Sequence, residues 1–421
     1  MVKGSALIFA LALFILAQAV SARTITVGAL GADTRSICEA IRIASNDDRI
    51  VVKKGTYREP EIVVDKRLFI VGDGWPVIDG GNAHQVMVVK SNGATISGFV
   101  IANTGISHID DRAGLRFDNV DGGTVEHCVF LNDLFAVYFA HSRNCRVLNN
   151  RIAGSATLEG SSGNGIHLWY CTNMSIKDNL ISLQRDGIYL EFVSDSTIAN
   201  NTCENNLRYG LHFMYSNNDK YAGNTFSRNG AGVAVMYSQN VNMARNTFLN
   251  NWGAASYGLL IKDLKNSKVC ENMFMRNTIG LQCDNINRLA IEKNNFIGNG
   301  HAVKITSFCS ESVFQHNNFV GNSFDLVTGA ALQACKFKEN FWDSNDGFDL
   351  NRDGIADCAY QPVKLSSWLL EHYPSASMLL RSPLFDLLDL SEKALPVLST
   401  ESLSDARPLM RRVQWKTPSS K

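Results

Sequence analysis

A repeat of about 22 residues is the feature that most constrains the fold of this chain. Glycines spaced by 22, 23, 22, 26 and 22 residues each begin a short run of alternating apolar and polar residues: Gly165, Gly187, Gly210, Gly232, Gly258 and Gly280. Phenylalanines spaced by 22, 26, 22, 23 and 22 residues form a second column: Phe226, Phe248, Phe274, Phe296, Phe319 and Phe341. The interval of 26 occurs in both columns, so it marks a single loop insertion.

The period and the composition of each repeat predict an all-β fold. Repeats of roughly 20 to 50 residues build solenoids, propellers or arrays. Strand-length apolar runs broken by Asn and Gly argue against helical repeats, and the sequence lacks the leucine ladder of a leucine-rich repeat. We therefore expect a right-handed parallel β-helix with about 22 residues per coil. Asn residues in segments such as "NTFSRN" (224–229) can form ladders between coils, and the Phe column can stack inside, about 4.8 Å per coil.

The chain divides into four segments on this interpretation. Residues 1–22 are predicted to be a signal peptide and residues 23–342 to form the β-helix, with an amphipathic helix at residues 37–44 over its first coil. Residues 343–363 form an acidic, turn-rich loop. Residues 364–421 are expected to form a tail of short amphipathic helices, broken by prolines, that ends in an extended stretch with little to bury.

The N-terminal residues and the charge balance limit which compartment and which partners we expect. One lysine, an apolar run from Ala6 to Ala17 and small residues before Arg23 are typical of a cleavable secretory signal. We therefore expect a soluble protein exported to the periplasm, associated with a membrane only through its partners. Removing Lys3 leaves 39 basic and 40 acidic residues, which does not favour a nucleic-acid or anionic-membrane partner.

Ten cysteines lie in the mature chain without a CxxC motif or a tight framework. A chain of this length buries a core without disulfides, although export permits them. We expect most of these cysteines to be small buried apolar residues, with one or two bridges whose pairing the sequence leaves open. They are Cys38, Cys128, Cys145, Cys171, Cys203, Cys270, Cys283, Cys309, Cys335 and Cys358.

The runs that follow the column glycines predict a face that points outward from one sheet. Alternation sends one set of side chains inward, namely Ile166, Ile188, Leu211, Val233, Leu259 and Leu281, with Leu168, Leu190, Phe213, Val235, Ile261 and Cys283. The outward columns are then His167, Tyr189, His212 and Ala234, and beside them Trp169, Glu191, Met214 and Met236. Met214 and Met236 fall on adjacent coils about 5 Å apart, and His167 lies two coils, roughly 10 Å, from His212.

This outward face is a candidate copper site. Imidazole and thioether groups suit a soft ion such as Cu(I), so the candidate ligands are His212, Met214, Met236 and His167. The alternative is that outward aromatic and methionine side chains form a docking face for a protein or a glycan without any metal.

A second candidate metal site is the segment "DLNRDGIAD" in the acidic loop. Its oxygens fall at positions 1, 3, 5 and 9 of a calcium loop, with the glycine of the sharp turn at position 6: Asp349, Asn351, Asp353, Asp357 and Gly354. Position 12 is Tyr360, so the usual bidentate Glu is missing. The alternatives are a structural calcium site and an Asx-rich turn without metal.

A catalytic role is the alternative from another functional class. Some β-helices are polysaccharide lyases or epimerases, whose grooves need paired carboxylates or an acid with a cationic base. Asp186, Glu191 and Arg208 lie on neighbouring coils, but no recurrent acidic cluster and no nucleophile with a base stands out. We therefore expect a protein that is not an enzyme, with a carbohydrate-active β-helix as the alternative.

The chain also resembles a known family, the NosD proteins. The resemblance rests on "DGIYLEFVSDSTIANN", "RYGLHFMYSNND" and "AGNTFSRNGAGVAVMYSQN", and on "FWDSNDGFDLNRDGIAD", "HYPSASMLLRSP" and "DARPLM" in the C-terminal quarter. "YGLHFMYS" and its echo "VAVMYS" are its most specific part. The similarity extends over nearly the whole mature chain.

The resemblance implies a function that spacing alone does not reveal. NosD proteins are periplasmic β-helices that assist the maturation of nitrous oxide reductase, where a copper–sulfide centre is assembled. They work with an ABC transporter, permease and ATPase together, to which their C-terminal region docks, and with a membrane-anchored copper chaperone. The resemblance therefore implies a scaffold that delivers copper, or assists sulfur supply, to nitrous oxide reductase, with copper as transient cargo on the His and Met face.

Overall fold

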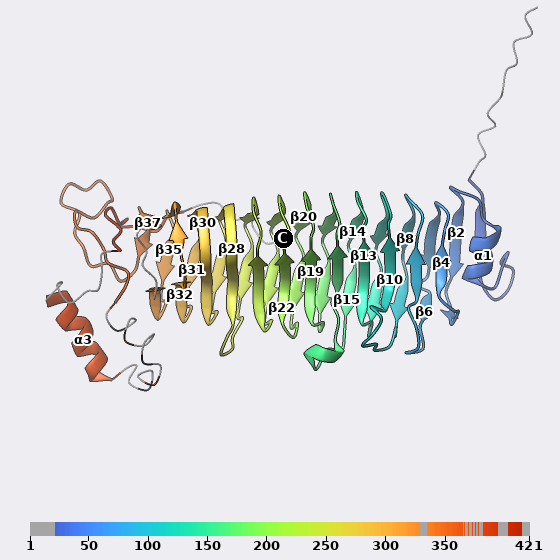
Figure 1. The fold of residues 1–421 in the computed structure, drawn as a ribbon, viewed down its shortest axis with the longest axis horizontal. Helices are drawn as coiled ribbons and strands as arrows, with labels where there is room; N and C mark the ends of the chain where they lie inside the picture. The colour runs from blue at the N-terminus through green and yellow to red at the C-terminus, as the bar shows by residue number, and fades with distance from the viewer. Residues whose placement is uncertain are drawn as a thin grey trace, which may run out of the picture.

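The computed structural model is a parallel β-helix, as predicted, with about 14 turns of about 23 residues. It describes residues 22–328, 335–364, 366, 369, 373, 375, 378, 382–394 and 403–414. Figure 1 shows the coils stacked in one row, with α1 at one end and the C-terminal segments at the other. Every pairing between named strands is parallel, so each coil adds its strands to those of the coil before it.

The strands form two sheets. The larger sheet has 25 strands: β1 (Thr24–Val27), β2 (Arg49–Lys53), β4 (Ile62–Val64), β5 (Phe69–Asp73), β7 (Met87–Val89), β8 (Thr95–Ser97), β10 (Ala113–Asp118), β11 (Thr124–Glu126), β13 (Phe135–Ala140), β14 (Arg146–Leu148), β16 (Ile166–Trp169), β17 (Ser175–Lys177), β19 (Asp186–Glu191), β20 (Thr197–Ala199), β22 (Tyr209–Met214), β23 (Lys220–Ala222), β25 (Ala231–Met236), β26 (Asn242–Ala244), β28 (Tyr257–Cys270), β30 (Ile279–Glu292), β32 (His301–Ile305), β33 (Cys309–Ser310), β34 (Ser312–Gln315), β36 (Phe324–Thr328) and β37 (Cys335–Lys338). The smaller sheet has 13 strands: β3 (Thr56–Tyr57), β6 (Val77–Asp79), β9 (Val100–Ala102), β12 (Val129–Leu131), β15 (Arg151–Ala153), β18 (Leu180–Ser182), β21 (Thr202–Glu204), β24 (Thr225–Ser227), β27 (Thr247–Leu249), β29 (Met273–Met275), β31 (Asn295–Ile297), β35 (Asn318–Val320) and β38 (Phe341–Trp342).

A helix covers the first coil, as the sequence predicts. α1 (Ile37–Ile43) begins at the N-cap Ser36, whose side chain accepts a hydrogen bond from the backbone of Glu39. Its apolar side contacts β1, β2 and β4. At its C-terminus the ammonium group of Lys66 donates to three carbonyl oxygens, which suits the negative end of the helix dipole. The exposed edge of the first coil is therefore closed.

The phenylalanine column stacks inside the helix, with one correction at its end. Rings from Phe226 to Phe319 lie on adjacent coils with centroids 4.6 to 5.6 Å apart. The next ring on Phe319 is Trp342, at 4.1 Å, and not Phe341 as the interval of 22 predicted. The register pairs Phe319 with Trp342, so the last coil is one residue longer than the predicted interval of 22. Phe341 therefore points away from the bore.

Two asparagine ladders run along the coils, as the sequence predicts. One ladder consists of Asn150, Asn179, Asn201, Asn224, Asn246, Asn272, Asn294, Asn317 and Asn340. The other consists of Asn206, Asn229, Asn251, Asn277, Asn299 and Asn322. Each side-chain oxygen accepts from the residue one coil earlier; Asn224, for example, donates its backbone and side-chain N–H to Asn246 Oδ1, both at 3.0 Å. The ladders satisfy buried backbone donors at the corners of the coils that they span.

The glycine column has a steric cause. A Cβ atom at Gly187 would lie 2.5 Å from the carbonyl oxygen of Gly210, and one at Gly232 would lie 2.2 Å from that of Gly258. Consecutive coils approach so closely there that no side chain fits. The glycines therefore mark where each strand enters the sheet, immediately before the residues of the outward face.

The C-terminal segment closes the other end of the helix, which corrects the expectation of an extended last stretch with little to bury. Asp405 is fully buried and takes the next place in the first asparagine ladder, where it accepts hydrogen bonds from both the backbone and the side chain of Asn340. It also accepts from Glu339 N and from Trp342 Nε1. Residues 403–414 thus act as a cap on the last coil.

Between the last coil and this cap, the structure describes one helix of the predicted tail, α3 (Pro383–Ala394). Pro383 is its first residue, where the missing N–H has no cost. The other two predicted breaks, Pro374 and Pro396, lie outside the described residues. Within the part of the chain that the structure describes, no helix is long and apolar enough to cross a membrane.

Candidate functional site

The outward face lies on β16, β19, β22 and β25, and its columns have the predicted register. His167 pairs with Tyr189, and Tyr189 with His212. In the adjacent column Glu191 pairs with Met214, which pairs with Met236. The inward columns predicted with them are fully buried in the bore. Sequence alternation therefore assigned each side chain to the correct face.

The two histidines, however, are buried, although the sequence predicts that they are exposed. His167 is 8% exposed and His212 is 7% exposed. The ring of His167 stacks on Tyr138 at 4.5 Å and contacts Phe135 and Tyr189. Aromatic side chains from neighbouring coils thus cover this face of the sheet, which alternation along one strand cannot reveal.

His167 and His212 are held apart in different environments. The Tyr189 ring lies between them, 4.8 Å from one ring centroid and 4.9 Å from the other. His167 Nδ1 is 3.0 Å from the side-chain nitrogen of Asn164, and burial, with help from Arg185, lowers the pKa of His167 to about 3. His167 is therefore a neutral, partnered side chain at neutral pH, and it does not meet the methionines.

His212 has the opposite character, because neither of its ring nitrogens has a hydrogen-bond partner among the described residues. The rings of Tyr189 and Tyr209 pack against it at 4.9 and 4.8 Å. Its Nδ1 lies 3.7 Å from Asp186 Oδ2, which is too long for a hydrogen bond. An unpartnered buried imidazole is costly for a fold, so this one is a candidate ligand.

The buried Asp186 and the partly exposed Arg208 form an ion pair beside His212. The carboxylate is fully buried and accepts two hydrogen bonds from the guanidinium, Nε to Oδ1 at 2.9 Å and Nη2 to Oδ2 at 2.5 Å. Burial raises the pKa of Asp186, but the hydrogen bonds from Arg208, together with the neighbouring His212, outweigh it and hold the pKa below its ordinary value. The geometry is that of a positioning pair and not of a carboxylate facing an open groove.

Met214 and Met236 are less buried than the two histidines of the face. Both are half-buried, and they are direct partners on adjacent strands. Met236 packs against a small apolar cluster that includes Ala234 and Tyr257. His212 lies two residues before Met214 on the same side of β22. One thioether pair thus lies next to one unpartnered imidazole.

An aromatic ladder flanks the methionines, and the sequence reasoning missed it. Tyr170, Phe192, Tyr215 and Tyr237 stack with centroids 4.6, 5.2 and 5.1 Å apart, and each is 39 to 47% exposed. Each ring directly follows a member of the Trp169–Met236 column, so the same intervals could have found it. The ladder and the methionines form one continuous surface over four coils.

The acidic loop has the turn geometry of its motif but no converging carboxylates. Asp349 accepts from the backbone of Asp353 and of Gly354, whose φ is +86°. Asp357 accepts from Leu350 N, and Asn351 Oδ1 accepts from Asp353 N. Across the described residues, no group of three or more His, Cys, Asp or Glu side chains is arranged to hold a metal. Calcium binding by this loop stays a prediction, and a copper site on the outward face depends on sulfur from methionine.

Comparisons with known proteins give similarities in sequence and in fold. Residues 154–351 match the family model described as "Periplasmic copper-binding protein (NosD)". A "Probable ABC transporter binding protein NosD" from Pseudomonas aeruginosa is 28% identical over 420 residues, which cover 87% of this chain and 89% of that protein. A protein of the same name from Stutzerimonas stutzeri is 30% identical over 124 residues, 29% of this chain and 28% of that protein.

Solved structures that are similar to this one share its architecture. The catalytic unit of a GH87 alpha-1,3-glucanase from Streptomyces thermodiastaticus has a TM-score of 0.57 at 13% identity and covers 78% of this chain and 67% of its own. The surface adhesin PfbA of Streptococcus pneumoniae has a TM-score of 0.51 at 14% identity, over 72% and 84% of the two chains. At such identities the likeness concerns the fold alone. Residues 154–351 are thus similar to the NosD family model, and the Pseudomonas aeruginosa relative extends this similarity over most of the chain.

Proposed function

We propose that this chain is a periplasmic, non-enzymatic accessory protein that binds copper transiently and works with an ABC transporter in the maturation of nitrous oxide reductase. The family description supports copper and the periplasm, and the names of the two relatives support the transporter. On this proposal copper is cargo, and the β-helix is a rigid support that presents it. A membrane-anchored copper chaperone would supply the ion.

The observation that carries the copper proposal is the pairing of Met214 with Met236 beside His212. Two thioether sulfurs from adjacent strands and one imidazole without a partner form a donor set that favours Cu(I) over harder ions. The half-exposure of the methionines supports exchange with a partner, since a fully enclosed ion could not be handed over. His167 is not part of this donor set, because its Nδ1 is 3.0 Å from the side-chain nitrogen of Asn164 and the Tyr189 ring lies between it and His212.

The Asp186–Arg208 pair supports a positioning role and not catalysis. Both of its charges are committed to each other, and Asp186 has no exposure to a substrate. The guanidinium also lies over the Tyr209 ring at 4.9 Å, which holds that ring against His212. We infer that the pair orients the wall of the copper site.

Copper binding is tested by competition titration of the mature protein with Cu(I) against a chromophoric chelator. We expect a Met214→Leu/Met236→Leu variant and a His212→Gln variant to lose at least about tenfold in affinity, or about 1.4 kcal/mol each. The matched control is Met273→Leu/Met275→Leu, which changes two half-buried methionines on β29, outside the face. Equal copper binding by all four proteins would remove this face as the site.

The transporter contact is proposed to lie on α3. Leu384, Leu387 and Leu390 are 49, 61 and 63% exposed on this helix, which leaves apolar surface for a membrane-protein partner. Deleting the whole tail would also remove the cap at residues 403–414, so a substitution is the cleaner test. We expect Leu384→Ser/Leu387→Ser/Leu390→Ser to lose co-purification with the permease while Ser391→Ala retains it. Retention by both variants would contradict the proposal.

A further inference from the structure

A second sulfur pair lies at the C-terminal end of the β-helix, away from the His and Met face. Cys309 and Cys335 are bonded to each other, 26 residues apart in sequence and 5.8 Å apart at their Cα atoms. Cys309 begins β33 and Cys335 begins β37, the last strand of the larger sheet. This is the disulfide found among the described residues, and the remaining eight cysteines have free thiols.

The free thiols have the properties of core side chains. Five of them are buried at separate points along the helix: Cys128, Cys145, Cys171, Cys203 and Cys283. Burial raises the pKa of Cys145 to about 11 and that of Cys128 to about 12, as expected for apolar surroundings. Only Cys309 and Cys335 bring two sulfur atoms together.

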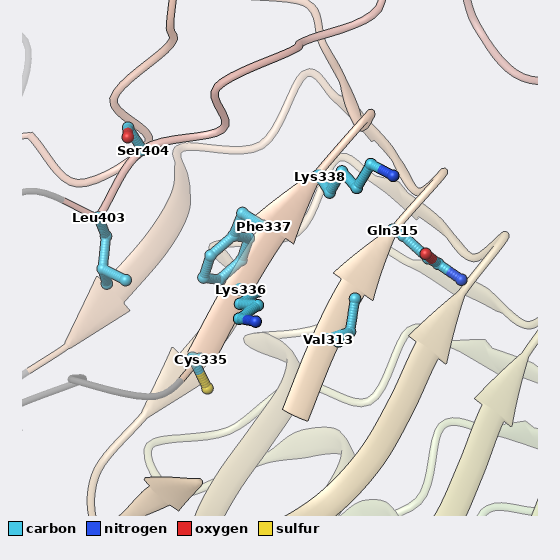
Figure 2. Close-up of a pocket in the computed structure, with 8 residues that line it drawn as sticks. All are labelled: Val313, Gln315, Cys335, Lys336, Phe337, Lys338, Leu403 and Ser404. Atoms are coloured by element: carbon cyan, nitrogen blue, oxygen red, sulfur yellow. The ribbon is translucent and has the colours of Figure 1, made fainter. Parts of the chain in front are cut away.

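One sulfur of this buried pair, that of Cys335, lies at the wall of a cavity. Cys335 lines a space of about 440 Å³ between the last strand and the C-terminal cap. Figure 2 shows Cys335, Lys336 and Phe337 along β37, with Leu403 and Ser404 on the segment opposite. Cys335 and Phe337 are buried on one face of β37, whereas Lys336 and Lys338 are exposed on the other. The surroundings of the sulfur pair are therefore largely apolar, which suits a soft ion of low charge.

The last coil does not depend on this bond for its position. Phe337 stacks on Phe314 at 4.7 Å, and four consecutive residues of β37 pair with β34. The asparagine ladder continues from Asn317 through Asn340 to Asp405. Because these contacts hold the coil, reduction of the bond leaves two thiols facing each other in place.

We propose that Cys309 and Cys335 form a second, redox-controlled site for Cu(I). A dithiol reductant of the thioredoxin type breaks the S–S bond with two electrons and two protons, and its own two thiols become a disulfide. The two cysteine thiols then release their protons and both sulfurs bind one Cu(I) ion. In the oxidised protein both sulfurs are bonded to each other and the site is closed. The choice of Cu(I) among soft ions rests on the proposed function, whereas the sulfur pair is independent of the His and Met face.

The test compares the full mature protein before and after reduction under anaerobic conditions. Thiol counting should give two more reactive thiols after reduction. Competition against a Cu(I) chelator should give one further copper equivalent, or at least about a tenfold gain in affinity. A Cys309→Ser/Cys335→Ser variant should lack this gain, and a Cys38→Ser/Cys270→Ser variant, which changes two partly exposed free thiols, should retain it.

A measurement on the unmodified chain keeps the proposal testable if the double variant fails to fold. Alkylation of the reduced protein with iodoacetamide, followed by peptide mass spectrometry, should label Cys335 at the cavity wall, and one equivalent of Cu(I) should protect it while Cys270 stays reactive. Equal labelling with and without copper would overturn the proposal. If Met214→Leu/Met236→Leu abolishes the additional copper binding that follows reduction, the Cys309–Cys335 pair is not a separate site. If that variant retains the gain, the pair binds copper even where the outward face does not.

Discussion

The inside of the β-helix and the outer face of the same strands differ in how strictly they repeat. In β19, β22 and β25 the inward residues are all aliphatic or aromatic and fully buried. The outward column beside them changes with every coil, from Tyr189 to His212 to Ala234. Each inward side chain packs on its neighbour one coil away and must match it in size, whereas the outer face needs only to leave the backbone pairing intact. The repeat therefore indicates the fold, and the outward positions that depart from it indicate the candidate site.

The largest expected effect breaks the inner stack. Phe274 lies between Phe248 and Phe296, at 4.6 and 4.7 Å. Phe274→Ala should lower the free energy of unfolding by about 3–5 kcal/mol, because it leaves a cavity between two rings. Urea unfolding gives this loss from the midpoint and slope. Met275→Ala, on the neighbouring outward position, should change it by less than about 1 kcal/mol; equal losses would erase the distinction between inside and outside.

The second prediction tests whether the first asparagine ladder depends on Asp405, its last member. Asp405→Ala removes the acceptor of several buried N–H groups and should open the final coil at a cost of about 2–3 kcal/mol. Hydrogen exchange at the backbone of Asn340 and at the Trp342 indole should rise accordingly. Asp405→Asn restores the side chain found on the other coils and should lose less. Unchanged protection in the alanine variant would mean that the cap is dispensable.

A third prediction concerns how stability depends on pH through His167 on the outer face. Burial holds the pKa of His167 at about 3, below its ordinary value of 6.5. Between these values the unfolded chain binds a proton that the folded chain does not, so stability is present above pH 6.5 and is lost as the pH falls. From pH 7 to pH 5 the loss attributable to His167 should be about 2 kcal/mol. His167→Phe keeps a stacked ring without a titratable group, and it should remove this share of the pH dependence. Parallel pH profiles for both proteins would contradict it.

The substitution that we expect to change stability least gives the most informative comparison between the inner stack and the outer face. Met214→Leu/Met236→Leu conserves volume at two half-buried positions, so the unfolding free energy should change by less than about 1.5 kcal/mol. Thermal unfolding measures this change on the same samples that are titrated with copper. We expect a nearly unchanged fold with weakened copper binding. A large loss of stability would place these methionines in the core and not in a working site.

Much of the fold could be predicted because it depends on local regularities. The alternation around Leu211 and Phe213 assigned the inward face correctly, and the intervals between glycines identified the parallel β-helix and its loop insertion. The prediction for Phe341 was wrong because the last coil is one residue longer than the interval of 22. Only the strand register reveals that Trp342 continues the stack. The candidate site was predicted in its columns but not in its burial.

The amino-acid sequence by itself determined the period, the two faces of each strand and the asparagine ladders, since these follow from spacing and side-chain type. The tertiary structure alone decided that aromatic rings bury His167 and His212, that Asp186 pairs with Arg208, and that Cys309 meets Cys335. It also brought Asp405 to Asn340, a residue 65 positions earlier. Each of these contacts depends on the path of the chain between separate coils and loops, and no repeat within a single coil contains that information.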